Sequence, residues 1–357
     1  MKRVHVVPSW SFRDSDGKQL NPQLFSLLSA IHETGKLTAA AAQIGISYRH
    51  GWNLLNTWAV FFGLPLVAMQ KGKGAKLTVL GEKLLWAEQR VLARLEPQLD
   101  SLTSELNLEI QRALEGVSPL MRLHATYGYA VALLPNFCGQ IQLDLQYKSA
   151  EEALASLSRG ACDVAGFHVP VNGRAGGMSD VMQENYLRHL KPRVHTLIKF
   201  IARRQGLMVK AGNPRQITTL QDLTKPDVRF INRQRDSGTR ALLDELLRRQ
   251  GIDCSEISGF DDEEFTHSAV AAFVAAGMAD VGMGVEPAAR QFGLDFLPET
   301  SEHYLLACHS RTLKQEAMVR LLDIIRADEF RNAVRALPGY APDDSGQIVK
   351  IGEIFQL

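Results

Sequence analysis

The sequence predicts a two-lobed α/β body that follows a small, α-rich head. Two observations predict this fold class. From Leu120 onwards, short apolar runs typical of strands alternate with helical segments, which favours a parallel sheet covered by helices. Before Leu120 the periodicity is helical, apart from one short hairpin pattern near residue 70. The 357 residues, 45% hydrophobic and 22% charged, are enough for two or three globular domains.

Composition argues against several classes of protein. No apolar run reaches the roughly 18 residues of a membrane span, and the first twenty residues lack the apolar segment of a signal peptide. The four cysteines are far apart in the sequence and form no CxxC pair, so they indicate reduced thiols and not a disulfide framework or a zinc site. We therefore expect a cytoplasmic protein without a membrane partner.

Charge is distributed unevenly along the chain. Residues 1–80 contain nine Lys and Arg against three Asp and Glu, a net charge of +6, whereas the remaining residues contain 31 against 36, a net charge of −5. This asymmetry indicates a basic head that meets a polyanion. A chance basic excess in a small soluble domain is the alternative.

Three helices are expected in the head. Residues 23–34 place four apolar side chains on one face, with Asn21 and Pro22 suited to the helix start and Gly35 to its end. A second helix, capped by Thr38, ends at Gly45. A third runs from Tyr48 to about Phe62 behind the cap Ser47, and its inner face is expected to comprise Trp52, Leu55, Trp58 and Ala59. Two short helices joined by a glycine turn are typical of a helix-turn-helix.

A hairpin is predicted directly after these helices. Residues 66–69 and 75–77 form its strands, and the turn between them carries the sequence KGKG. We therefore expect residues 1–80 to form a winged helix-turn-helix that binds double-stranded DNA, with Arg49 and Asn53 reading bases and the lysines contacting phosphates. The candidate DNA-binding residues are Thr38, Ser47, Tyr48, Arg49, His50, Asn53, Lys71, Lys73 and Lys76.

The head also carries a family resemblance. The stretches GISYRHGWNLLN and KGKGAKLTVLGEKLL resemble the winged-helix head of the molybdate-responsive regulator (ModE) family, a relative of the LysR-type head, from about Pro22 to Leu85. Gly51 departs from the pattern, since a helix former such as Ala is usual there. A glycine within a helix costs about 1 kcal/mol relative to alanine, so we expect a weakened recognition helix.

Residues 81–114 are predicted to form a linker helix that begins after the cap Thr78. Leucines at positions 92, 95, 99, 102 and 106 have the spacing of a coiled-coil seam, and Pro97 predicts a kink near Leu95. The seam predicts a homodimer that sets two recognition helices about one DNA turn (~34 Å) or a multiple apart. A helix packed on its own body is the alternative, and whether dimers pair into tetramers stays open.

Residues 119–357 are predicted to form a periplasmic-binding-protein-like clamp of two α/β lobes. Ligands in such sheets lie beyond the carboxyl ends of the strands, where helices begin and present free N–H groups. Small polar residues occur at these junctions, and they predict a small anionic effector between the lobes. Ordinary helix caps are the alternative, although the two arginines of RDSGTR exceed what a cap needs. The candidate ligand-binding residues are Thr126, Tyr127, Ser149, His168, Arg235, Ser237, Gly238, Thr239, Arg240, Thr266, His267 and Glu286.

The body resembles the PBP-like domain that is fused to molybdopterin-biosynthesis proteins and to helix-turn-helix heads. The resemblance spans about residues 120–340. It rests on Arg204–Leu207, Gly212–Pro214, Phe230–Arg235 with Ser237–Arg240, Thr266–Val270, Ala279–Gly284, Leu294–Phe296, Glu302 and Tyr304. It implies a molybdate- or tungstate-like oxyanion as the effector. Residues 125–128 read Ala-Thr-Tyr-Gly where relatives often carry Gly-Ser-His-Asp, so a small carboxylate such as formate stays open.

Catalytic motifs are missing from the sequence. It has no HExxH, GxSxG, P-loop or Cys/His cluster, and no nucleophile–base pair is apparent, so we expect neither an enzyme nor a bound metal or cofactor. A ligand-responsive regulator of a molybdenum-related operon explains the head and the linker. A molybdenum-cofactor biosynthesis protein with a basic head, and a DNA-binding protein whose clamp has lost its ligand, are the alternatives. The operator and the sign of regulation stay open.

Overall fold

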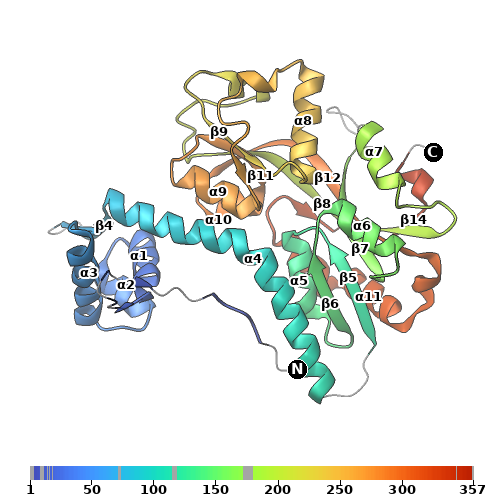
Figure 1. Ribbon diagram of the computed structural model, residues 1–357, viewed down its shortest axis with the longest axis horizontal. Coiled ribbons are helices and arrows are strands. Elements are labelled where there is room, and N and C mark those ends of the chain that lie inside the picture. The colour runs from blue at the N-terminus through green and yellow to red at the C-terminus, as the bar shows by residue number, and fades with distance from the viewer. Residues whose placement is uncertain are drawn as a thin grey trace. The chain divides into compact units, whose positions relative to one another are not determined.

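The computed structural model describes residues 4–8, 12, 13, 15, 17, 19–70, 74–114, 119–171, 180–342 and 344–355. Its contacts divide the chain into two compact units. The first unit is Val7–Ala93, and the second combines Met1–Val6 with Arg94–Leu357. The long helix α4 (Val79–Leu114) is shared between them (Figure 1).

In its described residues, the first unit contains three helices of its own, two short hairpins and the beginning of α4. Its elements are β1 (Phe12–Arg13), β2 (Gln19–Leu20), α1 (Gln23–Thr34), α2 (Leu37–Gln43), α3 (Tyr48–Phe62), β3 (Val67–Gln70) and β4 (Gly74–Leu77). Trp58, Leu24 and Leu28 are fully buried in its core. Ser47 Oγ accepts a hydrogen bond from His50 N, so the predicted cap of α3 is present. Gly35 and Gly63 end α1 and α3 in the left-handed conformation.

Two details of the head differ from the sequence prediction. Helix α2 begins at Leu37, whose buried side chain fixes the first turn in the core, so Thr38 lies within the helix and does not cap it. Trp52 is 40% exposed and stacks on Tyr48 at a ring distance of 6.4 Å. The inner face of α3 runs through Gly51, Leu54, Leu55 and Trp58, and it therefore leaves Trp52 on the open side.

The second unit is an α/β body built around one mixed sheet. The strands follow the order β10-β9-β11-β8-β12-β7-β5-β6, with β13 and β14 also paired to β8. The strands are β5 (Leu120–Ala125), β6 (Gln142–Tyr147), β7 (Val164–Pro170), β8 (His195–Val209), β9 (Phe230–Arg233), β10 (Glu263–Glu264), β11 (Val281–Val285), β12 (Asp295–His309), β13 (Tyr340–Ala341) and β14 (Ile348–Val349). The helices are α5 (Tyr129–Phe137), α6 (Ala150–Ser158), α7 (Asp180–Leu187), α8 (Gly238–Gln250), α9 (His267–Ala275), α10 (Glu286–Gln291), α11 (Glu316–Arg326) and α12 (Asp328–Arg335), with short 3-10 turns at Leu220–Thr224, Cys254–Glu256, Ser310–Lys314 and Ile351–Glu353.

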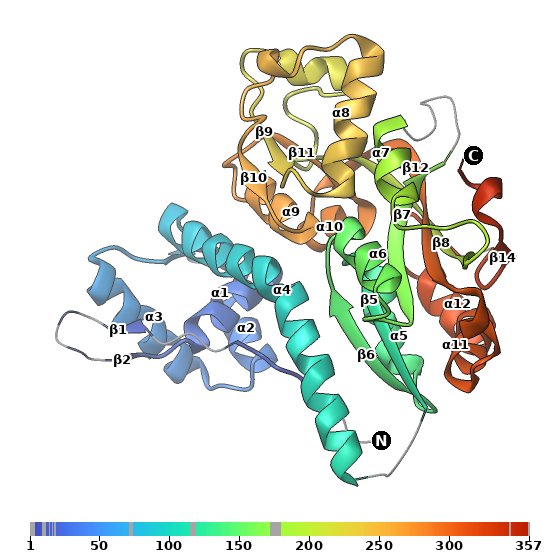
Figure 2. The same cartoon turned by 45° about the vertical axis from the view of Figure 1, so that its right-hand side comes forward.

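The two predicted α/β lobes are present, and they share this one sheet. Strands β5, β6 and β7 belong to the first lobe and β9, β10 and β11 to the second, and pairing within each of these groups is parallel. The long strands β8 and β12 pair antiparallel to each other and run through both lobes. In each lobe, helices cover both faces of the sheet and bury a separate apolar core on each face (Figure 2).

Strand β12 contains an irregularity. It runs through DFLP and EHYLLAC as one strand, although a proline and the polar stretch Glu299–Ser301 separate the two apolar runs. Its pairing register shifts between Pro298 and Thr300, which accommodates a proline that lacks an N–H for the ladder. A break in the pattern of strand residues therefore marks an irregularity here and not the end of a strand.

The part of α4 in the second unit covers the free edge of the sheet. Strand β6 is the last strand, and Ser101 and Ser104 of α4 accept hydrogen bonds from the backbone N–H groups of Tyr147 and Leu145. Ser104 also donates to the carbonyl of Leu143. This pairing protects an edge strand that would otherwise be open to another strand. No helix in the described parts of the chain is long and apolar enough to cross a membrane.

Candidate functional site

A cavity of ≈ 250 Å³ lies in the second unit where β8 passes from one lobe to the other. Both lobes contribute to its walls. The first lobe supplies Thr126, Tyr127, Tyr147, Lys148, Ser149, Ala150, Glu152, His168 and Tyr186. The second supplies Arg233, Gln234, Asp236, Ser237, Gly238, Thr239, Phe265, Thr266 and His267. Arg203 and Glu302 on β8 and β12, and Arg94, Pro97 and Gln98 on α4, complete the lining.

Nine of the twelve predicted ligand residues line this one cavity. They are Thr126, Tyr127, Ser149, His168, Ser237, Gly238, Thr239, Thr266 and His267. Eight of them follow a strand or begin a helix, whereas His168, predicted to follow the third strand, lies within β7 near its end. The carboxyl ends of the parallel strands bring these positions together. Ser149, Ser237 and Thr266 are the N-caps of α6, α8 and α9, and each side chain accepts a backbone N–H of its own helix.

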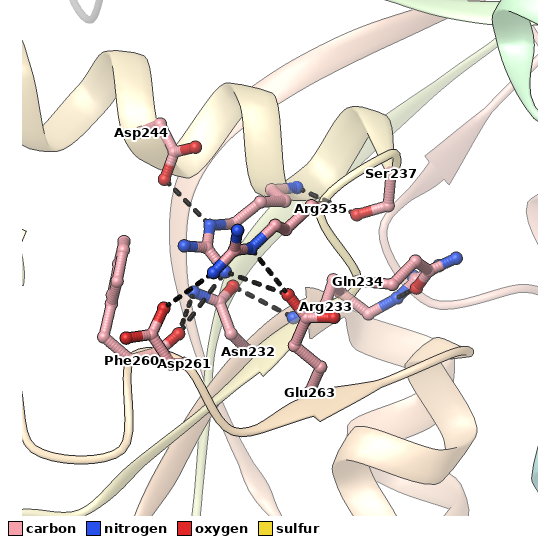
Figure 3. A network of polar contacts seen from close by, with 10 residues as sticks. Asn232, Arg233, Gln234, Arg235, Ser237, Asp244, Phe260, Asp261 and Glu263 are labelled. Atoms are coloured by element: carbon pink, nitrogen blue, oxygen red, sulfur yellow. Dashed lines mark hydrogen bonds and ion pairs between the residues drawn. The ribbon is translucent and has the colours of Figure 1, made fainter.

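The other three predicted ligand residues lie outside this cavity. Arg235 is exposed; its Nη2 lies 3.5 Å from Asp261 Oδ1 and its Nε lies 3.6 Å from Glu263 Oε1 (Figure 3). Arg240 is buried, with its guanidinium 4.1 Å above the Phe260 ring and its Nε donating to Asp244 at 3.0 Å. Glu286 accepts from Arg204 and Arg290. The acidic residues near position 261 therefore account for much of the positive charge in the RDSGTR stretch.

Arg203 is the most buried cation of the cavity, and the sequence did not single it out. It is 4% exposed, and its Nη2 lies 2.9 Å from Glu302 Oε2. Burial opposes its charge, but Glu302 and Tyr340 outweigh that effect and raise the pKa of the guanidinium. Its Nη1 has no hydrogen-bond partner of good geometry among the described residues.

Arg233 brings a second positive charge that is less well balanced. Its Nε donates to Gln234 Oε1 and its Nη2 to the carbonyl of Phe265. Within the described ranges, no carboxylate lies at ion-pair distance from it. Burial, followed by repulsion from Arg203, lowers the pKa of Arg233 to about 10. Asp236, Glu302 and Glu264 attract the guanidinium and offset part of this effect. The positive charge of Arg233 is therefore only partly balanced within the cavity.

Two buried histidines face the same charges. His168 Nδ1 lies 3.0 Å from Thr126 Oγ1, while its Nε2 has no partner in the described structure. His267 Nδ1 also lacks a partner there. Burial and the positive charges of Arg203 and Arg233 hold the pKa of both imidazoles well below its usual value, so both rings are neutral near pH 7.

These features together suit an anion. Unpaired buried polar atoms cost free energy, and an anion bound among them would accept hydrogen bonds from the arginines while reducing their mutual repulsion. Of the predicted hydroxyls, Ser149 already donates to the Glu152 carboxylate at 3.0 Å, so its hydrogen is used. Ser237 Oγ accepts from Arg240 N, which leaves its hydroxyl hydrogen available, and Thr239 accepts from Gln205 Nε2.

Sequence reasoning missed Arg203 and Arg233 although one signal was present. Arg203 and Arg204 interrupt the apolar strand TLIKFIARRQGLMV, and a charged residue within a buried strand requires a partner. Arg233 lies two positions before the arginine that the prediction favoured. In the described chain, no group of three or more His, Cys, Asp or Glu side chains is arranged to hold a metal ion.

The candidate DNA-binding residues lie on the first unit. Tyr48, Arg49, His50 and Asn53 are exposed along the first turns of α3, and Ser47 caps that helix. His50 Nε2 lies 3.3 Å from Gln23 Oε1 of α1. Thr38 is exposed on α2 and Lys76 on β4. Lys71 and Lys73 lie outside the described residues.

Comparison with known proteins gives one family and several relatives. Residues 133–326 match the family model described as the PBP superfamily domain. The uncharacterized protein YvgK of Bacillus subtilis (strain 168) is 29% identical over 209 residues, which cover 57% of this chain and 64% of that protein. An uncharacterized protein of Clostridium pasteurianum, from the 5′ region of a 2Fe-2S ferredoxin gene, is 38% identical over 109 residues, 30% of this chain and 96% of that protein.

A third relative is the molybdenum-pterin-binding protein MopB of Rhodobacter capsulatus. It is 33% identical over 106 residues, which cover 29% of this chain and 39% of MopB. The matches thus span less than two thirds of the length of YvgK and of MopB.

Two solved structures align over most of the chain. A hydrogen peroxide-bound OxyR mutant of Corynebacterium glutamicum gives a TM-score of 0.45 at 15% identity, over 90% of this chain and 95% of that one. CbnR, a LysR family transcriptional regulator, gives a TM-score of 0.40 at 16% identity, over 85% of this chain and 99% of CbnR. Since both scores are below 0.5, nothing about function follows from them.

Proposed function

The chain belongs to the PBP superfamily domain family, and from this premise we propose that it is a DNA-binding transcriptional regulator whose second unit senses a small anion. The observation that carries the proposal is the group of unbalanced positive charges and unpaired nitrogens in one cavity. His168 Nε2 and His267 Nδ1 lack partners among the described residues, Arg203 Nη1 has none of good geometry there, and Arg233 lines the same cavity. Few structural purposes require such an arrangement, whereas an anion would satisfy it.

A molybdate- or tungstate-like oxyanion is the effector that we favour. A molybdenum-pterin-binding relative and the resemblance of both parts of the chain to molybdenum-related proteins support this choice. Formate, as the substrate of a molybdoenzyme, is the alternative anion. A role in molybdenum-cofactor biosynthesis is the alternative function, and it leaves the basic head without a purpose.

DNA binding is the proposed role of the first unit. The exposed face of α3 presents Arg49 and Asn53 one helical turn apart, which suits contacts to base edges in the major groove. Exposed Lys76 on β4 suits a phosphate contact. A homodimer through α4 would present two such helices to one operator.

Calorimetry tests the effector and gel shifts test the DNA. Molybdate, tungstate, sulfate and formate are titrated into the full chain, and a duplex selected by the protein from a random pool is then bound with and without the tightest anion. We expect one anion to bind with 1:1 stoichiometry per protomer and to change the affinity for the duplex. Absence of binding by all four anions contradicts the sensing role, and equal affinity for selected and scrambled duplexes contradicts specific DNA binding.

A further inference from the structure

Helix α4 forms one wall of the anion cavity, through Arg94, Pro97 and Gln98. At this wall Arg94 Nε lies 2.9 Å from Glu264 Oε2, and its guanidinium lies 5.0 Å from the centre of the Phe265 ring. Glu264 is fully buried, on strand β10 of the second lobe. Arg94 therefore connects α4 to the second lobe through a charge pair in which one partner is removed from water.

The same helix is attached to the first lobe a short distance further along. Glu96 hydrogen-bonds the Tyr127 hydroxyl, and Ser101 and Ser104 accept from the backbone of β6. Pro97 lies between Arg94 and these serines, where it removes a backbone hydrogen bond from the helix. The helix is thus attached to the second lobe before Pro97, at Arg94, and to the first lobe both just before Pro97, at Glu96, and beyond it, at the two serines.

An attachment to both lobes makes α4 sensitive to their separation. If an anion draws the lobes together, Arg94 moves with the second lobe while Ser101 and Ser104 stay with the first. The helix must then bend at Pro97 or the Arg94–Glu264 pair must break. Breaking it would take the close positive charge of Arg94 away from a fully buried carboxylate, which is costly, so bending is favoured.

We propose that the Arg94–Glu264 pair is the element that transmits anion binding from the cavity to α4, and through α4 to the DNA-binding unit. This inference rests on the proposed function, and it adds the route by which the two sites are coupled. An effector alters DNA binding only if it favours one state of an element that both sites bias. In this chain that element is α4 around Pro97.

The test compares Glu264→Gln with a matched control. Glu263→Gln makes the same change one residue earlier on β10, where the carboxylate faces Arg235 and Arg240 and not α4. Neither glutamate lines the cavity. The coupling factor is the ratio of duplex affinities with and without a saturating anion, molybdate being the first probe and formate the second. Hydrogen exchange of the α4 backbone is measured on the same proteins without anion.

We expect Glu264→Gln to keep anion affinity within roughly threefold of the unmodified chain while its coupling factor falls towards one. Backbone exchange at Arg94–Gln98 should accelerate and that at Ser104–Leu108 should not, because only the first attachment is weakened. Glu263→Gln should leave both measurements unchanged. A second variant, Arg94→Gln with Glu264→Gln, removes both charges and should show the same loss of coupling if the single variant does not fold.

Two results would overturn the inference. An unchanged coupling factor in Glu264→Gln, with the anion bound, would show that the signal takes another route. Unchanged exchange at Arg94–Gln98 would show that the pair does not hold the helix, and this result is independent of any ligand. Failure of the unmodified chain to bind any anion instead contradicts the proposed function, while the exchange measurement still decides whether the attachment exists.

Discussion

Arg203 and Arg233 place two positive charges in one cavity, where burial and mutual repulsion both oppose their charged forms. Glu302 neutralises Arg203. Burial, followed by repulsion from Arg203, lowers the pKa of Arg233 to about 10, and attraction from Asp236, Glu302 and Glu264 offsets this only in part. A protein that only needed a stable core would gain by replacing such a cation. Its presence beside histidine nitrogens without partners in the described structure agrees with the proposed anion.

Replacing Arg233 with Gln should weaken anion binding and leave stability equal or slightly higher. A hydrogen bond to a charged group contributes roughly 1.5–3 kcal/mol, so the affinity should fall by about ten- to a hundredfold, while relief of the repulsion with Arg203 favours the fold. Calorimetry and thermal unfolding measure the two effects. Arg235→Gln removes the same charge from the exposed residue outside the cavity and should bind normally. Equal losses in both variants would place the anion elsewhere.

The two cavity histidines predict a defined pH dependence. Their pKa values are held well below the usual value by burial and the arginines, so the folded chain stays neutral at His168 and His267. The unfolded chain takes up protons near pH 6.5. The associated stability is therefore fully present above about pH 6.5 and is lost as the pH falls below it. Midpoints of unfolding measured between about pH 8 and 5 should show this decrease in stability. The double variant His168→Gln with His267→Gln should show a smaller decrease.

A bound anion should raise the pKa values of His168 and His267, because its negative charge opposes the positive charges of Arg203 and Arg233 that lower them. Binding should therefore take up protons and become tighter as the pH falls from about 8 to 6. Calorimetry in two buffers with different ionisation enthalpies measures the uptake. His303→Gln is the matched control, because the pKa of His303 is also lowered by burial but this residue does not line the cavity. Absence of proton uptake on binding would contradict the proposed charge arrangement.

Helix α3 contains a glycine whose replacement has a clear expected sign. Gly51 is buried in the helix interior, and a Cβ there would meet three side-chain carbons at 3.5–3.6 Å, an ordinary contact distance. Gly51→Ala should stabilise the first unit by about 1 kcal/mol. Gly74→Ala is the opposite case, since φ is 97° and a Cβ would collide with the Gly35 carbonyl. The midpoint temperature of thermal unfolding should rise for Gly51→Ala and fall for Gly74→Ala. A fall for both variants would mean that α3 needs its glycine.

The exposed face of α3 and strand β4 predict different effects on DNA affinity. Arg49→Ala should cost about 1–3 kcal/mol on the selected duplex and little on a scrambled one, because it removes a base contact. Lys76→Ala should weaken both duplexes similarly and reduce the salt dependence, because it removes a phosphate contact. Gel shifts at several salt concentrations separate the two. Equal losses on both duplexes for Arg49→Ala would contradict base reading.

Patterns of neighbouring residues predicted most helices and strands. They did not predict the contacts between segments that are far apart in the sequence. Ser47 and Thr78 cap the starts of α3 and α4, because a side-chain oxygen beside a helix start satisfies its own backbone N–H groups. Trp52 was assigned to the wrong face since a large apolar side chain is not a reliable indicator of burial at one position. Arg203 and Arg233 are 30 positions apart in sequence, and only the sheet brings them together.

At the scale of the whole molecule, α4 is the one long helix that both units share. Within the second unit, its serine face is used by strand β6, and Leu108 is buried. The opposite face carries Leu95, Leu102 and Leu106, which are 37%, 52% and 44% exposed. Single exposed leucines are common on protein surfaces, but three at this spacing form an apolar stripe on one face of a helix. Such a stripe suits the predicted dimer seam.

Replacing Leu102 and Leu106 with Lys should shift the chain towards monomer. Burying a leucine contributes roughly 1.5–3 kcal/mol, and each change counts twice in a symmetric dimer, so the dimer affinity should fall by at least about a hundredfold. Operator affinity should fall with it, because one protomer then contacts only a half-site, while anion affinity per protomer stays within about threefold. Val319→Lys, at a 44% exposed position on α11, is the control and should leave sedimentation unchanged. If the double variant sediments as the unmodified chain does, the leucine face packs on something other than a second copy, and the pairing of recognition helices must come from another surface.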